Sequence, residues 1–201
     1  GFRPPAGVKP DWNLLETEID DIIEVLGRDR LDLPQIRLSD AFTAGRLDEL
    51  VLFLTRLKEK GKIAAPVFYS GDMDQAVLSA GLNKGLLEVV MRPLGLLNPV
   101  AVNFLPLVEK AGAGFIALVP FQKGLLFDCG REAGLSDHDV ARAAWGWLLD
   151  CPGLSSVLFG VTGPGQVRDN LAALAQAAPP SPDLLARLFQ TTAYDRFITE
   201  M

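Results

Sequence analysis

Apolar residues recur every three or four positions in several stretches of the chain, which is the spacing of an amphipathic helix. The first stretch covers residues 14–26, and Asn13 with Glu16 is expected to cap its start. Further helices are predicted over residues 47–60, 72–80, 99–111, 136–149, 164–175 and 183–189. Ser136 is the expected cap of the helix over 136–149, and Pro164 suits the first turn of the next helix.

Short, almost continuously apolar runs lie between these helices. We expect the strands Leu31–Arg37, Ile63–Tyr69, Leu86–Met91, Gly114–Val119 and Ser155–Phe159. Continuous apolar runs are typical of strands that are covered on both faces, and strict alternation with helices predicts parallel βαβ units. About eight strands are needed to close a (β/α)8 barrel. Periodicity alone therefore leaves an open, doubly wound sheet as an alternative.

Composition and charge exclude several classes of protein. A chain of 201 residues, 49% hydrophobic and 22% charged, has the length and composition of a single domain over residues 1–201. The net charge of −6 argues against nucleic acid as a partner, because phosphate contacts need clustered Lys and Arg. No apolar run has membrane-spanning length. Cys129 and Cys151 are far apart, which favours reduced thiols and a cytoplasmic protein.

The loops near the C-terminus and two segments upstream carry the recognisable motifs. In the loops, the pattern Pro-Leu-x-x-Gly-x-Leu is met at Pro120, Gly124 and Leu126, and Gly-x-x-x-Pro-x-Gln-x-x-x-Asn at Gly160, Pro164, Gln166 and Asn170. Upstream, residues 47–63 resemble Leu-x-x-Leu-Lys-x-x-Gly-Lys-Ile, and Asp32 fits Ile-Asp-Leu-x-x-x-His. In this order and spacing the motifs resemble those of the aldo/keto reductases.

The resemblance implies a (β/α)8 TIM-type barrel and an activity. The chain would be the part of that barrel from the third helix onward, and is expected to be incomplete at its N-terminus. The implied activity is NAD(P)H-dependent reduction of an aldehyde or ketone, a small-molecule carbonyl substrate. The family's catalytic Asp, Tyr and Lys would lie upstream, and its catalytic His aligns with Arg37. Arg can donate hydrogen bonds but is permanently charged, so an Arg37 that only pairs with Asp32 or Asp40 is the alternative.

The resemblance also assigns positions to the cofactor, NADP or NAD. The candidates are Ser70, Phe121, Gly124, Gly160, Thr162, Gly163, Gln166 and Asn170. Gln166 and Asn170 lie one helical turn apart, beside a helix N-terminus that favours an anion. Because no Arg or Lys lies between residues 160 and 167, the preference between NADP and NAD stays open.

Three positions depart from the family pattern around the nicotinamide. Tyr69, followed by Ser70, stands where the family has Ser-Asn, Met91 where it has Gln, and Leu118 where many members have a stacking Tyr. These changes favour a second hypothesis, in which a degenerate barrel serves as a binding or regulatory subunit. His138 has no Cys or second His nearby, so no metal site is expected. The sequence does not indicate an oligomeric state.

Overall fold

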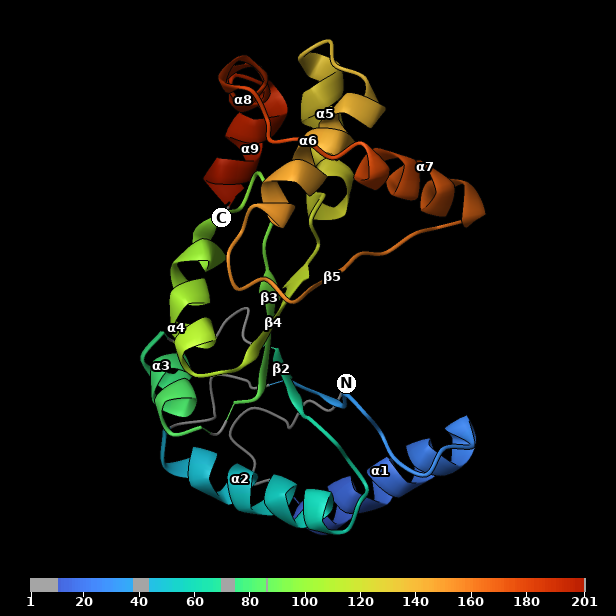
Figure 1. Ribbon diagram of the computed structural model, residues 1–201, viewed down its shortest axis with the longest axis vertical. Coiled ribbons are helices and arrows are strands. Elements are labelled where there is room, and N and C mark those ends of the chain that lie inside the picture. Colours follow the sequence, from blue (N-terminus) through green and yellow to red (C-terminus); the bar gives the residue numbers. More distant parts are fainter. Residues whose placement is uncertain (1–10, 38–43, 70–74, 86, 201) are drawn as a thin grey trace. The chain divides into compact units, whose positions relative to one another are not determined.

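Five short strands form one sheet in the order β1-β2-β3-β4-β5 (Figure 1). The computed structural model describes residues 11–37, 44–69, 75–85 and 87–200. The strands are β1 (Gln35–Arg37), β2 (Val67–Tyr69), β3 (Val89–Pro93), β4 (Gly114–Leu118) and β5 (Ser156–Leu158). The pairs β1–β2, β2–β3 and β4–β5 are parallel. Strands that neighbour one another in sequence order and alternate with helices confirm the βαβ architecture expected from the apolar pattern.

Helices precede the first strand, connect all of the strands and follow the last one. They are α1 (Trp12–Leu26), α2 (Ala44–Glu59), α3 (Gln75–Asn83), η1 (Val100–Phe104), α4 (Leu105–Lys110), η2 (Gln122–Gly124), α5 (Leu125–Glu132), α6 (Asp137–Leu149), α7 (Pro164–Ala175), α8 (Pro182–Phe189) and α9 (Thr192–Glu200). Within the residues that the structure describes, none of these helices combines the length and the apolar character needed to span a membrane.

The chain groups into two compact units. The first contains residues 1–92 and 107–115, and the second contains residues 93–106 and 116–201. The first therefore carries α1 to α3 with β1, β2 and most of β3. The second carries η1, the end of β4, β5 and helices α5 to α9.

In the first unit, α1 and α2 are joined by one aromatic contact and a cluster of charges. Trp12 stacks on Phe53 with ring centroids 4.9 Å apart. Next to it, the Glu16 carboxylate accepts hydrogen bonds from Lys60 at 2.6 Å and Lys62 at 2.7 Å. The core of this unit consists of apolar side chains from both helices, α3 and the strands, among them Leu15, Leu50, Leu57, Phe68, Leu78 and Val90.

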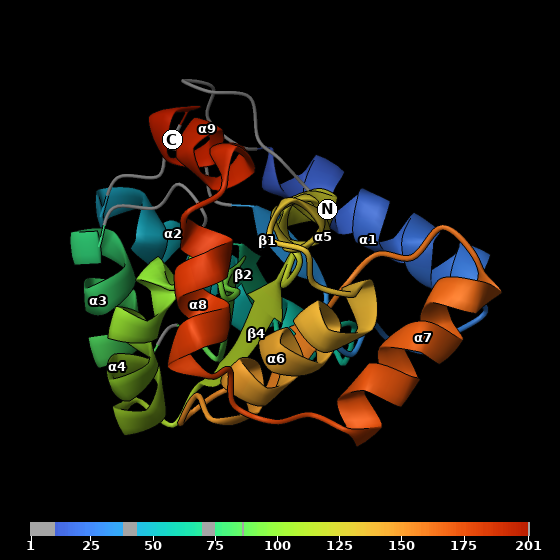
Figure 2. The ribbon, with the colours of Figure 1, turned by 90° about the horizontal axis from the view of Figure 1, so that it is seen from above.

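In the second unit, α6 is the central helix. It packs against α5 and α7, while α5 also packs against α8 and α9 (Figure 2). Glycines permit two close approaches of α6 to its neighbours. A Cβ on Gly130 of α5 would lie 2.5 Å from Val140 Cγ2, and a Cβ on Gly146 of α6 would lie 2.1 Å from the Ala178 carbonyl. This tight packing holds the start of α6 next to the loops described below.

The strands are shorter than the apolar runs that predict them. Leu31 and Ile63 meet only in an isolated bridge, and regular pairing of β1 with β2 begins at Gln35 and Val67. Pro34 lies between these points; it has no N–H to donate, although its carbonyl accepts from the Val67 amide at 2.9 Å. An apolar run marks where a strand is buried, and the hydrogen-bonded ladder decides how far it extends.

Several helix boundaries also differ from the sequence prediction. The cap of α1 is Asp11, whose Oδ1 accepts from the backbone amides of Asn13 at 3.0 Å and Leu14 at 3.2 Å, so the predicted Asn13–Glu16 cap is wrong. The helix predicted to end at residue 80 continues through Gly81 to Asn83 in α3. The helix predicted over 99–111 divides into η1 and α4, and helices α5 and α9 were not predicted. The boundaries of α7 and the Ser136 cap of α6 are confirmed.

Candidate functional site

The second unit contains a pocket with a volume of about 810 Å³. Its walls come from the turn after β4, the first turns of α5, α6 and α7, and the loop after β5. The lining residues are Val119, Pro120, Phe121, Lys123, Gly124, Phe127, Asp128, Arg131, Asp137, His138, Ala141, Phe159, Gly160, Thr162, Gln166, Asp169, Asn170 and Ala172. The pocket thus lies at the C-terminal ends of β4 and β5, the end of parallel strands where (β/α)8 proteins place their active sites.

The turn after β4 has an unusual backbone. Val119, Gln122 and Lys123 have φ angles of 46°, 48° and 56°, a region that side chains with a Cβ seldom enter. Such conformations cost roughly 1–3 kcal/mol each and persist only when the surrounding structure enforces them. Gly95 allows the turn to pack closely, because a Cβ at that position would lie 2.4 Å from the Pro120 carbonyl oxygen. The strained turn places Lys123 and Gly124 in the lining of the pocket.

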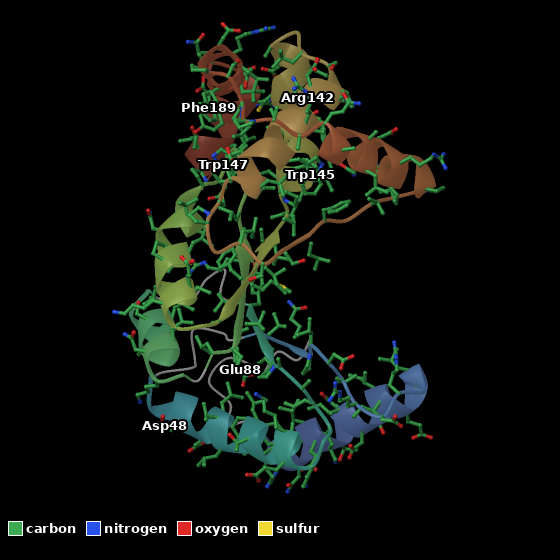
Figure 3. The ribbon with its side chains drawn as sticks, in the orientation of Figure 1. Asp48, Glu88, Arg142, Trp145, Trp147 and Phe189 are labelled. Carbon is green, nitrogen blue, oxygen red and sulfur yellow. The ribbon has the colours of Figure 1, made fainter. Side chains whose placement is uncertain are left out.

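An aromatic cluster forms the apolar wall of the pocket. Phe121 contacts Phe127 at 5.1 Å between ring centroids and meets Trp145 edge-on at 5.4 Å. Phe159 completes the cluster, 5.2 Å from Trp145 (labelled in Figure 3). Trp145 and Phe121 are almost fully buried. These rings link the loops after β4 and β5 to α6, and therefore fix the shape of the pocket.

The loop after β5, which begins with Phe159, leads into α7. The Thr162 amide donates to the Gln166 side-chain oxygen at 2.8 Å, which closes the loop over the first turn of the helix. Gly163 is the N-cap residue and makes no side-chain cap hydrogen bond, so the first amides of α7 keep donors available. A Cβ at Gly160 or Gly163 would meet no atom within 4 Å. Packing within the protein therefore does not require glycine at these two positions.

Most of the cofactor positions proposed from sequence come together here. Phe121 and Gly124 arrive from the β4 turn, and Gly160, Thr162, Gln166 and Asn170 from the β5 loop and α7. Gly163 lies between Thr162 and α7 but does not line the pocket, and Ser70 lies outside the described residues.

The ionised groups of the pocket were not singled out in the sequence. Arg131 Nη1 donates to both Asp137 oxygens at 3.1 and 3.2 Å, and its Nη2 donates to Asp128. The hydrogen bond that Arg131 donates to Asp128 and the charge of both carboxylates raise the pKa of Arg131 above its ordinary value. Asp128 and Arg131 lie three positions apart on α5, a helix that was not predicted. Opposite charges at this spacing are typical of a helix, so this pair is the sequence signal that indicates both the helix and its two charged residues.

His138 also lines the pocket, at the start of α6. Among the described residues, no group of three or more His, Cys, Asp or Glu side chains is arranged to bind a metal. His138 is thus only one of the residues that line the pocket.

The first unit carries the proposed catalytic position. Arg37 is the last residue of β1 and pairs in register with Tyr69 of β2, which in turn pairs with Met91 of β3. Arg37 and Tyr69 are the last residues of β1 and β2, and Met91 is the middle residue of β3, so the three positions selected by the family comparison lie side by side on neighbouring strands. Met91 is buried, with 7% of its surface exposed, and Tyr69 is half-buried. The side chain of Arg37 lies outside the described part of the structure.

Comparison with solved structures shows what the fold is similar to. The holo form of aldo-keto reductase AKR11C1 from Bacillus halodurans superposes with a TM-score of 0.72 and 18% identity, covering 90% of this chain and 68% of that one. Glycerol dehydrogenase AKR11B4 from Gluconobacter oxydans gives a TM-score of 0.66 at 19% identity, covering 94% and 65%. The thermostable aldo-keto reductase Tm1743, solved with the inhibitor epalrestat, gives 0.64 at 16% identity, covering 87% and 64%.

The likeness establishes an aldo-keto reductase fold. Together with the parallel strands in sequence order, it makes the chain part of a (β/α)8 barrel, as the motif order predicts. The chain spans about two thirds of the length of these structures. No protein-family model and no curated protein match its sequence.

Proposed function

We propose that the pocket binds the adenosine and phosphate part of a nicotinamide dinucleotide, NAD or NADP, in an oxidoreductase of the aldo/keto reductase type. One observation carries this proposal. Residues from two loops, separated by about forty positions in the chain and selected only by their motifs, line a single pocket beside α5 and α7. Its volume suits a ligand of this size, since small-molecule pockets usually measure about 300–1,000 Å³.

The turn 119–124 suits the pyrophosphate. Residues 122–124 all have positive φ, and the turn brings Lys123 and Gly124 into the pocket lining. Gly124 caps α5 without a side-chain hydrogen bond, and Lys123 adds a positive charge at the rim. The amides at the start of α7, with Thr162 and Asn170, suit the phosphate and ribose of the adenosine.

The nicotinamide would be held less firmly. Leu118 at the end of β4 offers an apolar contact where a stacking ring would add roughly 0.5–1.5 kcal/mol. When bound, the cofactor supplies the hydride for carbonyl reduction. The residues of this chain bind and orient it, and the burial of Phe121 and Trp145 keeps water from that wall. The proposed setting is the cytoplasm, where Cys129 and Cys151 would remain the free thiols seen here.

A direct binding experiment tests the cofactor site. NADH and NADPH are titrated into the natural full-length protein by calorimetry, with Asn170→Ala and Gln166→Ala as variants. Each variant is expected to weaken binding about tenfold, equivalent to about 1.4 kcal/mol. Arg168→Ala is the matched control, because Arg168 lies in the same turn of α7 but does not line the pocket. Tight binding that neither α7 variant changes would place the cofactor elsewhere.

The second candidate function is a barrel without hydride chemistry that acts as a binding or regulatory subunit. The buried, apolar Met91 favours it, because Met cannot replace the hydrogen bonds of the family's Gln at that level of β3. Arg37 decides between the two. In a reductase its fixed positive charge should favour anionic substrates such as keto acids, or stabilise a developing alkoxide.

NADPH and NADH oxidation by the full-length protein is therefore measured against pyruvate-like acids and neutral aldehydes, for wild type and Arg37→His. Preference for acids that is lost in Arg37→His supports the reductase with this role. No activity in wild type and recovery in Arg37→His supports the degenerate barrel. If wild type and Arg37→His turn over neutral aldehydes at the same rate, both roles given to Arg37 are contradicted.

A further inference from the structure

The last helix, α9, is joined to α5 by a carboxylate of that helix. The Oε2 atom of Glu132 accepts a hydrogen bond from the Thr192 hydroxyl at 2.7 Å and another from the Ala193 amide at 3.2 Å. Glu132 thus binds one of the backbone amides that the start of a helix leaves without an intrahelical partner. The hydrogen bond from Thr192 is the main cause that lowers the pKa of Glu132 below its ordinary value, which favours the ionised form.

The stability of α9 depends on this docking. Its nine residues are fewer than the roughly 12–15 that an isolated helix needs to be stable in water. Among the side chains of α9 that the structure describes, only that of Ala193 is buried. Phe189 and Tyr194, with ring centroids 4.9 Å apart, join α9 to α8. The helix therefore relies on a few points of attachment, and Glu132 provides two hydrogen bonds among them.

The packing between α5 and α9 is incomplete. A cavity of about 520 Å³ remains between them, and Leu125 of α5 and Phe197 of α9 both line it. Apolar side chains that face an open space lose dispersion contacts on that side. Arg196 of α9 comes only within 3.9 Å of Glu132, beyond hydrogen-bond distance, and 74% of its side chain is exposed. The hydrogen bonds of Glu132 should therefore supply a large share of the docking.

The docking of α9 also concerns the larger pocket described above. Asp128 and Arg131 of α5 line both the cavity beside α9 and that pocket. Arg131 continues the connection, because its Nη1 donates to both carboxylate oxygens of Asp137 at the start of α6. A movement of α9 away from α5 would therefore act on the helix that carries the charged wall of the pocket.

We propose that α9 is a C-terminal strap that Glu132 fastens to α5, and that its docking holds the α5 wall of the pocket in place. Short segments with few buried contacts are those that open locally while the rest of a protein stays folded. When the hydrogen bonds of Glu132 open, α9 leaves α5 and loses its helical structure. The wall formed by Asp128, Arg131 and Asp137 then becomes less ordered. This attachment does not depend on what the pocket binds.

Hydrogen exchange of the full-length protein, followed by mass spectrometry, tests the attachment. Glu132→Ala should raise the exchange rate of the α9 amides about tenfold, because it removes an ionised acceptor of two hydrogen bonds. Glu132→Gln keeps an acceptor oxygen and should give a smaller increase. Thr192→Val combined with Glu132→Ala should fall short of the product of the two single effects, because both remove the same hydrogen bond. Asp195→Asn, the matched control, removes a charge from α9 and should have less than about a twofold effect.

Two further measurements test the effect on the pocket. The amides of residues 125–138 should exchange several-fold faster in Glu132→Ala, while those of α2 in the first unit should keep their wild-type rates. Titration with NADH should show affinity reduced several-fold in Glu132→Ala and unchanged in Asp195→Asn.

Each outcome has a distinct meaning. Unchanged α9 exchange in Glu132→Ala overturns the attachment. Faster exchange in α9 alone, with residues 125–138 and NADH affinity as in wild type, overturns the effect on the pocket. An equal increase in α2 indicates global destabilisation and overturns the strap as a local device. If wild type binds no NADH, the proposed function fails, while the exchange rates still decide the role of Glu132.

Discussion

The charge cluster around Glu16 permits a quantitative prediction about stability. The Glu16 carboxylate accepts hydrogen bonds from Lys60, Lys62 and Arg56, the last at 3.2 Å, and 15% of its side chain is exposed. The hydrogen bonds from Lys60 and then Lys62 are the main causes that lower the pKa of Glu16 from 4.5 to about 2. The perturbation is Glu16→Gln, which keeps the shape of the side chain and removes its charge.

The pKa shift sets an upper limit on the effect. At 1.36 kcal/mol per pKa unit, the difference between folded and unfolded states corresponds to about 3 kcal/mol. Because 46% of Lys60 and 48% of Arg56 remain exposed, water and salt screen the cluster. We therefore expect Glu16→Gln to lower the free energy of unfolding by about 1–2 kcal/mol at pH 7.

The sign of the pH dependence follows from the lowered pKa. Well above pH 4.5 the carboxylate is ionised in both states, so its full contribution is present there and is lost as the pH falls through 4.5 towards 2. Near pH 3 the difference between wild type and Glu16→Gln should be less than half its value at pH 7. It should also shrink in 1 M NaCl, where the screening length is about 3 Å.

Urea denaturation followed by far-UV circular dichroism at pH 7, 4 and 3 measures these differences. Glu18→Gln is the matched control, because Glu18 lies on the same helix, is exposed and forms no ion pair with a described residue. It should change stability by less than about 0.5 kcal/mol. Equal effects of the two substitutions, or a Glu16→Gln difference that does not decline with pH, would refute the reasoning.

Further predictions concern packing and association. Gly146→Ala should destabilise the protein by about 1–3 kcal/mol in thermal denaturation, because the new Cβ would meet the Ala178 backbone at 2.1 Å. Gly165→Ala, where no atom lies within 4 Å, should be neutral or stabilise α7 by up to about 1 kcal/mol, and an equal loss in both would contradict the packing argument. Val25 and Leu26 on α1 are 85% and 59% exposed, so the 201-residue chain should self-associate in sedimentation experiments, and Val25→Lys with Leu26→Lys should shift it towards monomer. A wild-type chain that sediments as a monomer would contradict this last expectation.

The motifs at the two C-terminal loops show which parts of the site are determined by short stretches of sequence. Phe121, Gly124, Gln166 and Asn170 are recognisable from the sequence because turns and helix starts depend on residues only a few positions apart. The α7 boundaries and the Ser136 cap of α6 follow from the same short-range chemistry. The alternation of apolar strands and helices likewise predicts the order and direction of the sheet.

Contacts between distant segments decided the rest. Asp11 caps α1 while Glu16 bonds to Lys60 and Lys62, 44 and 46 positions away, a choice that no local pattern reveals. The charge state of the pocket depends on which carboxylates hold Arg131, and so on how α5 packs against α6. Local propensity selects helices, turns and apolar strands, because these depend on neighbouring residues. Charge pairing and the depth of a pocket depend on which surfaces meet, and therefore only the tertiary structure determines them.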